Sequence, residues 1–264
     1  MQWLVCWGEP LLSHSPMTLR EHEFTDLPTF TGPMRTHVIC PAAEGRFPGI
    51  VLWSEIFQVT GPIRRTAALL AGHGFVVAVP EVYHELEEPG TVLAYDAAGV
   101  ERGNTHKVTR TLTAYDSDAA AAVAFLQNHP ACTGKIGTVG ICLGGHLATR
   151  TALLPDVSAG VCCYPTDIHQ GSLGQGMADD TLGRLASLKA EMLYIWGRQD
   201  PHIPREGRRL IYDALTDGGV KFTWHEFNGQ HAFLRDEGPR YDPELASLTW
   251  TLVTAMLRRC LQRT

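Results

Sequence analysis

The chain has 264 residues, of which 44% are hydrophobic and 19% charged, so it can bury the core of an ordinary globular protein. Its net charge of −6, with no basic run, argues against nucleic acid or an anionic membrane surface as a partner. No apolar stretch is long enough to span a bilayer, and the seven cysteines include no CxxC pair. These features predict reduced thiols in a cytoplasmic protein.

The chain begins with an apolar stretch, MQWLVCWGEPLLSHSP, which has no basic segment and is interrupted by Glu9 and Pro10. A cleaved signal peptide is therefore not expected. We interpret residues 1–30 as a loosely ordered N-terminal extension and residues 31–264 as a single domain.

From residue 36 onward, short apolar runs alternate with segments of helical spacing. The predicted strands cover 36–41, 49–54, 75–80, 135–140, 157–163, 190–197 and 220–227. The predicted helices cover 61–74, 115–130, 143–153, 204–217 and 243–261. Continuous apolar strands separated by helices predict an α/β fold, with a mostly parallel central sheet and helices on both faces.

One segment, 81–110, is long, rich in glycine and charge, and shows no clear period. Loops of this length without secondary structure tend to be functional. We therefore interpret it as a candidate substrate lid.

The stretch GTVGICLGGHLA (137–148) has the pattern of a buried strand, a turn bounded by glycines and a helix. Cys142 stands at the apex between Gly140 and Gly144, which matches the nucleophile elbow G-x-S-x-G with sulfur in place of oxygen. Glycines are needed there because flanking Cβ atoms would clash with the adjoining strand and helix. The helix N-terminus favours a thiolate, and the N–H of Leu143 would point to a developing oxyanion.

Two further reactive residues follow predicted strands. Asp200 comes after the strand at 190–197, and His231 comes after the strand at 220–227. The order nucleophile, acid, histidine is that of the α/β-hydrolase triad. We predict Cys142 as nucleophile, His231 as base and Asp200 as the group that orients the imidazole. The alternative is that Cys142 is a buried core residue.

At these residues the sequence resembles the dienelactone hydrolases, also called carboxymethylenebutenolidases. The resemblance rests on four motifs, GICLGGH, GRQDPHIP, QHAF and the long stretch LWSEIFQVTGPIRRTAALLAGHGFVVAVPEVY, and it covers roughly residues 35 to 260. It implies an α/β-hydrolase fold. It also implies hydrolysis of a lactone or ester through a cysteine acyl-enzyme, without a metal or an organic cofactor.

The same resemblance suggests roles for three more residues. Glu55 would be a catalytic carboxylate beside the resting thiol, and it would keep that thiol neutral by like-charge repulsion until substrate binds. Ile56 would supply the second oxyanion N–H. Arg235 would hold a substrate carboxylate through bidentate pairing, although it could instead pair with a nearby acidic residue on a surface turn.

The sequence departs from the family at one position. The family often has an arginine shortly after the segment P-x-x-Y, whereas this chain has His84 and Glu85 there. We take His84 as a candidate substrate-binding residue. Other histidines in predicted loops, His106, His169 and His202, have no HxH or HExxH spacing, so no metal site is predicted.

The sequence thus predicts a cysteine-dependent hydrolase that cleaves an activated lactone or ester and works as a monomer or homodimer on a small-molecule substrate. Three alternatives stay open. The chain could be a thioesterase or carboxylesterase for another small acyl group. It could be a thiol redox sensor on a hydrolase scaffold, or an interaction protein with a vestigial site.

Overall fold

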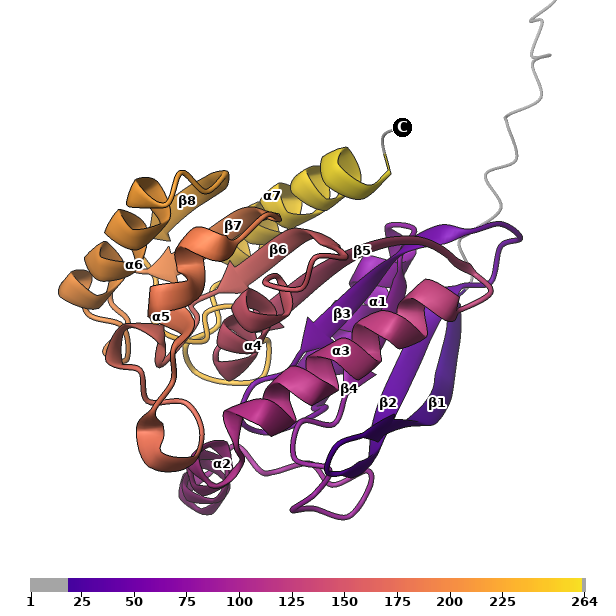
Figure 1. Ribbon diagram of the computed structural model, residues 1–264, viewed down its shortest axis with the longest axis horizontal. Coiled ribbons are helices and arrows are strands. Elements are labelled where there is room, and N and C mark those ends of the chain that lie inside the picture. Colours follow the sequence, from indigo (N-terminus) through magenta and orange to yellow (C-terminus); the bar gives the residue numbers. More distant parts are fainter. Residues whose placement is uncertain (1–18, 263–264) are drawn as a thin grey trace, which may run out of the picture.

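A computed structural model describes residues 19–262 of the chain (Figure 1). Its strands form a single sheet in the order β1-β2-β4-β3-β5-β6-β7-β8. Strand β2 pairs antiparallel with β1 and with β4, and every other neighbouring pair is parallel. The strands are β1 (Leu19–Thr29), β2 (Gly32–Pro41), β3 (Phe47–Trp53), β4 (Val76–Pro80), β5 (Cys132–Ile141), β6 (Val157–Cys163), β7 (Glu191–Gly197) and β8 (Phe222–Phe227).

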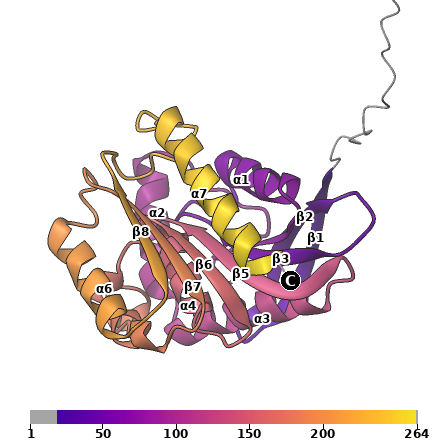
Figure 2. The same cartoon turned by 90° about the horizontal axis from the view of Figure 1, so that it is seen from above.

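Helices cover the sheet on both sides. Figure 2 shows α1 and α7 over one face, with α3, α4 and α6 over the other. This arrangement confirms the predicted α/β-hydrolase class, with its mostly parallel central sheet. The helices are α1 (Gly61–Gly72), α2 (Ala97–Thr109), α3 (Leu112–Asn128), α4 (Leu143–Thr151), α5 (Thr181–Arg184), α6 (Arg205–Asp217) and α7 (Pro243–Leu261). None of the helices within residues 19–262 has the length and apolarity that a bilayer crossing needs.

The central strands are buried on both faces. Ile50, Val51 and Leu52 of β3 are fully buried, and the same holds for Val76 to Val79 of β4. Helices on the two sides leave no polar face, which is why these strands are continuous apolar runs in the sequence. The carboxyl ends of the parallel strands meet at one edge of the sheet, where ligands bind in folds of this kind.

The N-terminal boundary predicted at residue 30 is wrong for the part that the structure describes. Leu19–Thr29 forms strand β1, which pairs with β2 at the edge of the sheet. Leu27 is buried, but most other β1 side chains of known placement are exposed or half-buried. An edge strand of this kind lacks the apolar run that marks a central strand. The rest of the predicted extension, residues 1–18, lies outside the described residues.

The segment 81–110 was predicted to lack secondary structure, and this is wrong for its second half, which is helix α2. The Asp96 side chain caps α2 by accepting a hydrogen bond from Gly99 N at 2.8 Å. The Tyr83 hydroxyl donates to the Gly103 carbonyl at 2.9 Å, and Arg102 of α2 pairs with Glu87 at 2.6 Å. These contacts fasten α2 to the preceding loop, and its role as a substrate lid stays a prediction.

Candidate active site

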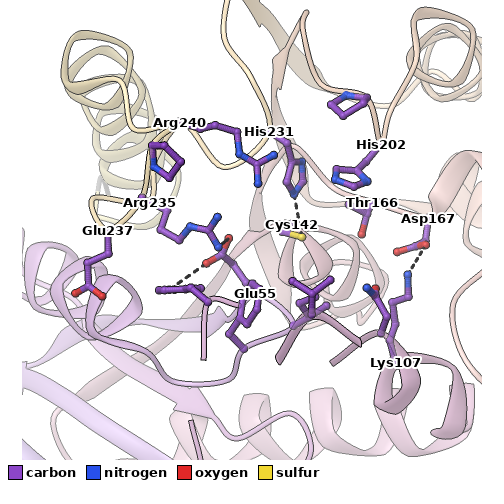
Figure 3. A pocket seen from close by; sticks show the side chains of 18 of the residues that line it. Glu55, Lys107, Cys142, Thr166, Asp167, His202, His231, Arg235, Glu237 and Arg240 are labelled. Atoms are coloured by element: carbon purple, nitrogen blue, oxygen red, sulfur yellow. Dashed lines mark hydrogen bonds and ion pairs between the residues drawn. The ribbon is translucent and has the colours of Figure 1, made fainter. Parts of the chain in front are cut away.

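The predicted triad residues all follow strands that end at the same edge of the sheet. Cys142 follows β5, Asp200 follows β7 and His231 follows β8. Glu55 follows β3, which is the strand between β4 and β5 in the sheet. Figure 3 shows Cys142 facing His231, with Glu55 on the neighbouring wall of the same pocket.

The turn at Cys142 is a strained elbow. Cys142 has φ 60° and ψ −120°, a conformation that residues with a side chain seldom adopt, and it directly precedes α4. A Cβ atom on Gly140 would lie 1.8 Å from the Gly144 carbonyl oxygen. One on Gly144 would lie 2.2 Å from the Trp53 carbonyl oxygen. Both glycines are therefore required by backbone that passes close to them.

The three triad residues form one hydrogen-bonded chain. His231 Nε2 lies 3.2 Å from Cys142 Sγ, and His231 Nδ1 lies 2.6 Å from Asp200 Oδ2. The other oxygen of Asp200 accepts a hydrogen bond from the His202 backbone N–H at 2.8 Å. All three side chains are buried. The carboxylate can therefore fix both the tautomer and the orientation of the imidazole.

The surroundings of His231 favour its charged form. Burial alone would lower the pKa of His231, but the neighbouring Cys142 side chain and the Asp200 carboxylate outweigh burial and raise this pKa to about 10. The rings of Tyr164 and His202 contact the imidazole edge to face, with centroids 5.0 and 4.7 Å away. At neutral pH the imidazole of His231 is therefore held in its charged form beside Cys142 and Asp200.

The raised pKa of His231 has a measurable consequence. Because this pKa is about 10, we expect the imidazole to lose its proton near pH 10 rather than near the ordinary histidine value of about 6.5. Asp200→Asn removes one of the groups that raise the pKa, so the titration of His231 should move to lower pH in that variant. NMR of the ring nitrogens as a function of pH measures both titrations. A wild-type His231 that titrates near pH 6.5 would contradict this account of the site.

Two backbone N–H groups are candidates for an oxyanion hole. Leu143 is the first residue of α4, so its N–H has no acceptor within the helix. Ile56 lines the same pocket as Cys142, and its N–H donates none of the hydrogen bonds found within residues 19–262. Helix α2 packs closely against the backbone at Ile56. A Cβ atom added to Gly103 of this helix would lie only 2.5 Å from the Ile56 carbonyl oxygen.

Glu55 is buried in the pocket wall and contacts residues other than the thiol. Its Oε1 lies 3.8 Å from Arg235 Nη1, and its Oε2 accepts a hydrogen bond from the Tyr95 hydroxyl at 3.5 Å. Burial raises the pKa of Glu55, and the Arg235 charge opposes that rise. The resemblance implied a resting state with Glu55 beside the thiol. The structure instead has Cys142 hydrogen-bonded to His231.

Arg235 lies in the pocket rather than on a surface turn. Its guanidinium carbon lies 4.3 Å from the centre of the Tyr95 ring. The acidic residues that follow Arg235 in the sequence are engaged elsewhere, since Asp236 and Glu237 pair with Arg65, and Asp242 caps α7. The pairing of Arg235 with a surface acidic residue is therefore wrong.

The assignment of His84 to substrate binding is also wrong. Its Nε2 lies 3.2 Å from Asp118 Oδ1 on α3 and 3.3 Å from Arg110 Nη2. The His84 side chain is only 2% exposed, and it is not among the residues that line the thiol pocket. The buried carboxylate of Asp118 needs hydrogen-bond donors, and His84 and Arg110 serve that structural need.

The pocket above Cys142 has a volume of about 680 Å³, which suits a small organic molecule. Helix α2 contributes Val100, Asn104 and Lys107, none of which the sequence singled out. The loop after β8 contributes Arg240 as well as Arg235. The weak apolar period of α2 gave no signal that this segment forms a wall of the site. Within residues 19–262, no group of three or more His, Cys, Asp and Glu side chains is arranged to hold a metal ion.

A mostly parallel sheet with a nucleophile elbow after β5, an acid after β7 and a histidine after β8 defines an α/β-hydrolase. The model of the dienelactone hydrolase family matches residues 34–261, and the chain belongs to that family. Family membership identifies it as a hydrolase.

Individual relatives agree with this assignment. The putative carboxymethylenebutenolidase of Saccharomyces cerevisiae is 42% identical over 224 residues, which cover 81% of this chain and 82% of the relative. The carboxymethylenebutenolidase of Pseudomonas sp. (strain P51) is 29% identical over 231 residues, covering 86% and 91%. A crystal structure of a putative dienelactone hydrolase from Klebsiella pneumoniae superposes with a TM-score of 0.78 at 22% identity, covering 90% of this chain and 98% of that one.

Proposed function

We propose that the protein hydrolyses an activated lactone or ester through an acyl-enzyme on Cys142. The observation that carries this proposal is the hydrogen-bonded chain from Cys142 Sγ through His231 to Asp200. It lies in a cavity of about 680 Å³ that can hold a small acyl compound. Relatives of the chain bear the names carboxymethylenebutenolidase and putative carboxymethylenebutenolidase, which support cleavage of the ester bond of a lactone.

In the acylation step, the Cys142 thiolate attacks the carbonyl carbon and forms a carbon–sulfur bond. The carbonyl electrons move to oxygen, where the N–H groups of Leu143 and Ile56 can donate to the oxyanion. When the intermediate collapses, the carbon–oxygen bond to the leaving group breaks. The imidazolium of His231 gives its Nε2 proton to the departing oxygen, which leaves a thioester and a neutral imidazole.

In the deacylation step, neutral His231 takes a proton from a water molecule as that water attacks the thioester carbon. The carbon–sulfur bond breaks, the acid product leaves, and the thiolate–imidazolium pair forms again. Asp200 holds Nδ1 protonated through both steps, so that Nε2 is always the atom that exchanges the proton.

The thiol restricts the substrate class. A thiolate is itself a good leaving group, so the tetrahedral intermediate of an amide tends to revert to substrate by expelling sulfur. Lactones, enol esters and thioesters release a leaving group that competes with the thiolate. We therefore propose activated acyl substrates rather than peptides.

We propose that Glu55 and Arg235 act in sequence when a substrate carboxylate binds. Arg235 can offer its full guanidinium to a substrate carboxylate only after Glu55 moves or takes up a proton. Burial raises the pKa of Glu55, which makes that protonation easier. Glu55 then controls when Arg235 becomes available.

The proposal is tested with a substrate panel. Wild type should turn over 4-nitrophenyl acetate, a thioester and a five-membered enol lactone, and should not turn over the matching 4-nitroanilide. Release of nitrophenol, thiol or acid measures each rate. No turnover of any member, together with rapid iodoacetamide labelling of Cys142, would contradict the proposal and support the redox-sensing alternative.

We also propose that the protein works in a reducing compartment such as the cytoplasm, because the chemistry needs a free thiol at Cys142. Every proposed site residue comes from one copy of the chain, so the mechanism requires only the small-molecule substrate as partner. Both a monomer and a homodimer satisfy it.

A further inference from the structure

An ion pair lies in the pocket wall on the side of Cys142 that is away from Arg235 (Figure 3). Lys107 Nζ of α2 lies 2.8 Å from Asp167 Oδ1 in the loop after β6, and Ser172 Oγ donates to the same oxygen at 2.9 Å. The exposed fraction is 15% for the Lys107 side chain and 9% for that of Asp167. The pair is therefore largely removed from water, although both residues line the pocket.

Other contacts also fasten α2 to this loop. Gly174 N donates to the Lys107 carbonyl at 3.3 Å, and Gln175 N donates to the Arg110 carbonyl at 2.7 Å. A largely buried ion pair gives up its hydration, so its presence is weak evidence of a role in folding stability. Asp167 also has a φ of 70°, and backbone strain of this kind collects at functional sites. These features favour a functional role for the pair.

The second oxygen of the Asp167 carboxylate lacks a donor. Oδ2 is buried and has no hydrogen-bond partner within residues 19–262. Thr166, the preceding residue, lines the pocket and is half-buried. Burial alone would raise the pKa of Asp167, but Lys107 lowers it, and the Thr166 hydroxyl beside the carboxylate adds to that effect. The carboxylate therefore stays ionised at neutral pH, beside a hydroxyl in the pocket wall.

This arrangement suits a neutral hydrogen-bond donor. When Thr166 Oγ1 donates to Asp167 Oδ2, the threonine oxygen is left as an acceptor for a group in the pocket. The charge of the carboxylate strengthens that acceptor, because hydrogen bonds in a chain polarise one another. A cationic ligand is disfavoured, because Lys107 already balances the charge of Asp167 at 2.8 Å. A hydroxyl group is the neutral donor that fits.

Thr166 is also close to the reacting centre. Its backbone N–H donates to the Cys142 carbonyl at 3.3 Å, and both residues line the same cavity. A group bound at Thr166 therefore belongs to the part of the substrate within a few bonds of the carbonyl that Cys142 attacks.

We propose that Thr166, polarised by Asp167, binds a hydroxyl group on the acyl part of the substrate and makes the enzyme select hydroxylated esters or lactones over their deoxy analogues. This inference rests on the proposed hydrolase function. Thr166 is the residue that touches the substrate, whereas Asp167 and Lys107 are positioning residues that act through it.

The direct test compares two esters that differ in one hydroxyl group, 4-nitrophenyl 3-hydroxybutyrate and 4-nitrophenyl butyrate. Wild type should have the higher kcat/KM for the hydroxylated ester. Thr166→Val removes the hydroxyl at nearly constant size and should lower the ratio of the two kcat/KM values by at least about tenfold, the effect of one charge-assisted hydrogen bond. Thr166→Ser should keep the preference, because it keeps the hydroxyl. The matched control is Thr251→Val on the exposed side of α7, which should leave the ratio unchanged.

The positioning role of Asp167 is tested with the same two esters. Asp167→Asn should lower the ratio although the Thr166 hydroxyl is kept, because an amide polarises that hydroxyl less than a carboxylate does. The kcat/KM for 4-nitrophenyl butyrate should change little, which separates a loss of selectivity from general damage to the site. A ratio equal to that of wild type would show that Asp167 does not act through Thr166.

Binding without turnover decides the assignment even if neither ester is hydrolysed. The 4-nitroanilides of the same two acids are amides, which the enzyme should bind but not cleave, and a bound anilide protects Cys142 from iodoacetamide. The hydroxylated anilide should protect wild type at a lower concentration than the deoxy anilide. Thr166→Val should remove that difference, and Thr251→Val should keep it.

The outcomes separate this inference from the proposed function. Absence of ester turnover in wild type would refute the proposed function alone. Equal protection of wild type by the two anilides, or a difference that survives in Thr166→Val, would overturn the assignment of the hydroxyl subsite to Thr166.

Discussion

Replacement of Cys142 by alanine is expected to lower kcat/KM for 4-nitrophenyl acetate by at least about 10⁴-fold, because the nucleophile and its covalent intermediate are both lost. Alanine leaves the imidazole, the backbone N–H groups and the pocket unchanged, so the residual rate would come only from binding and electrostatics. The rate of nitrophenol release at saturating and at low substrate concentration measures the loss.

The matched control is Cys142→Ser, which keeps a hydrogen-bonding group in the elbow. A serine must lose its proton to His231 during attack, whereas the thiolate has already done so, and we expect this variant to be slow but more active than alanine. Thermal unfolding should show that both variants fold. If Cys142→Ala kept more than about a tenth of the wild-type rate, the nucleophile would be another residue.

Replacement of Asp200 by asparagine is expected to cost about 10³- to 10⁴-fold in kcat, the scale of effect seen when a triad carboxylate becomes an amide. Asp200 accepts two hydrogen bonds, one from His231 Nδ1 and one from the His202 backbone. An amide can accept only through its oxygen. If that oxygen stays on the His202 N–H, its NH₂ group faces Nδ1, which forces the proton of the neutral imidazole onto Nε2. His231 then cannot accept a proton from water.

The same substitution should also lower the pKa of His231, because the Asp200 carboxylate helps to raise it. Less imidazolium then faces the thiol, so iodoacetamide should label Cys142 more slowly at neutral pH than in wild type. Asp213→Asn, on the exposed side of α6, provides the control for a surface aspartate. An Asp200→Asn enzyme with wild-type kcat and wild-type labelling would show that the carboxylate has no part in the reaction.

The fold class could be predicted because each central strand carries a continuous apolar run. The positions of Cys142, Asp200 and His231 could be predicted because parallel strands end at one edge, and the structure brings these three side chains into one hydrogen-bonded chain. Their order along the chain and the glycines of the elbow are local signals. Such signals can be recognised in the sequence without knowledge of the tertiary contacts.

Other features depend on tertiary contacts and left no local signal. Strand β1 lies at a sheet edge and exposes most of its described side chains, so it has no apolar run. Helix α2 buries only Gly99 and Gly103, and therefore shows no apolar stripe. His84 follows a conspicuous motif, yet Asp118, distant in the sequence, determines where its ring lies.

The central claim is that Cys142 becomes acylated during turnover, and rapid-quench mass spectrometry tests it most directly. Enzyme mixed with excess 4-nitrophenyl acetate and quenched with acid within the first turnover should carry one acetyl group on the peptide that contains Cys142. The adduct should disappear when the ester is exhausted, and it should be absent in Cys142→Ala. Turnover with no adduct at any time, or an adduct on another residue, would contradict the account.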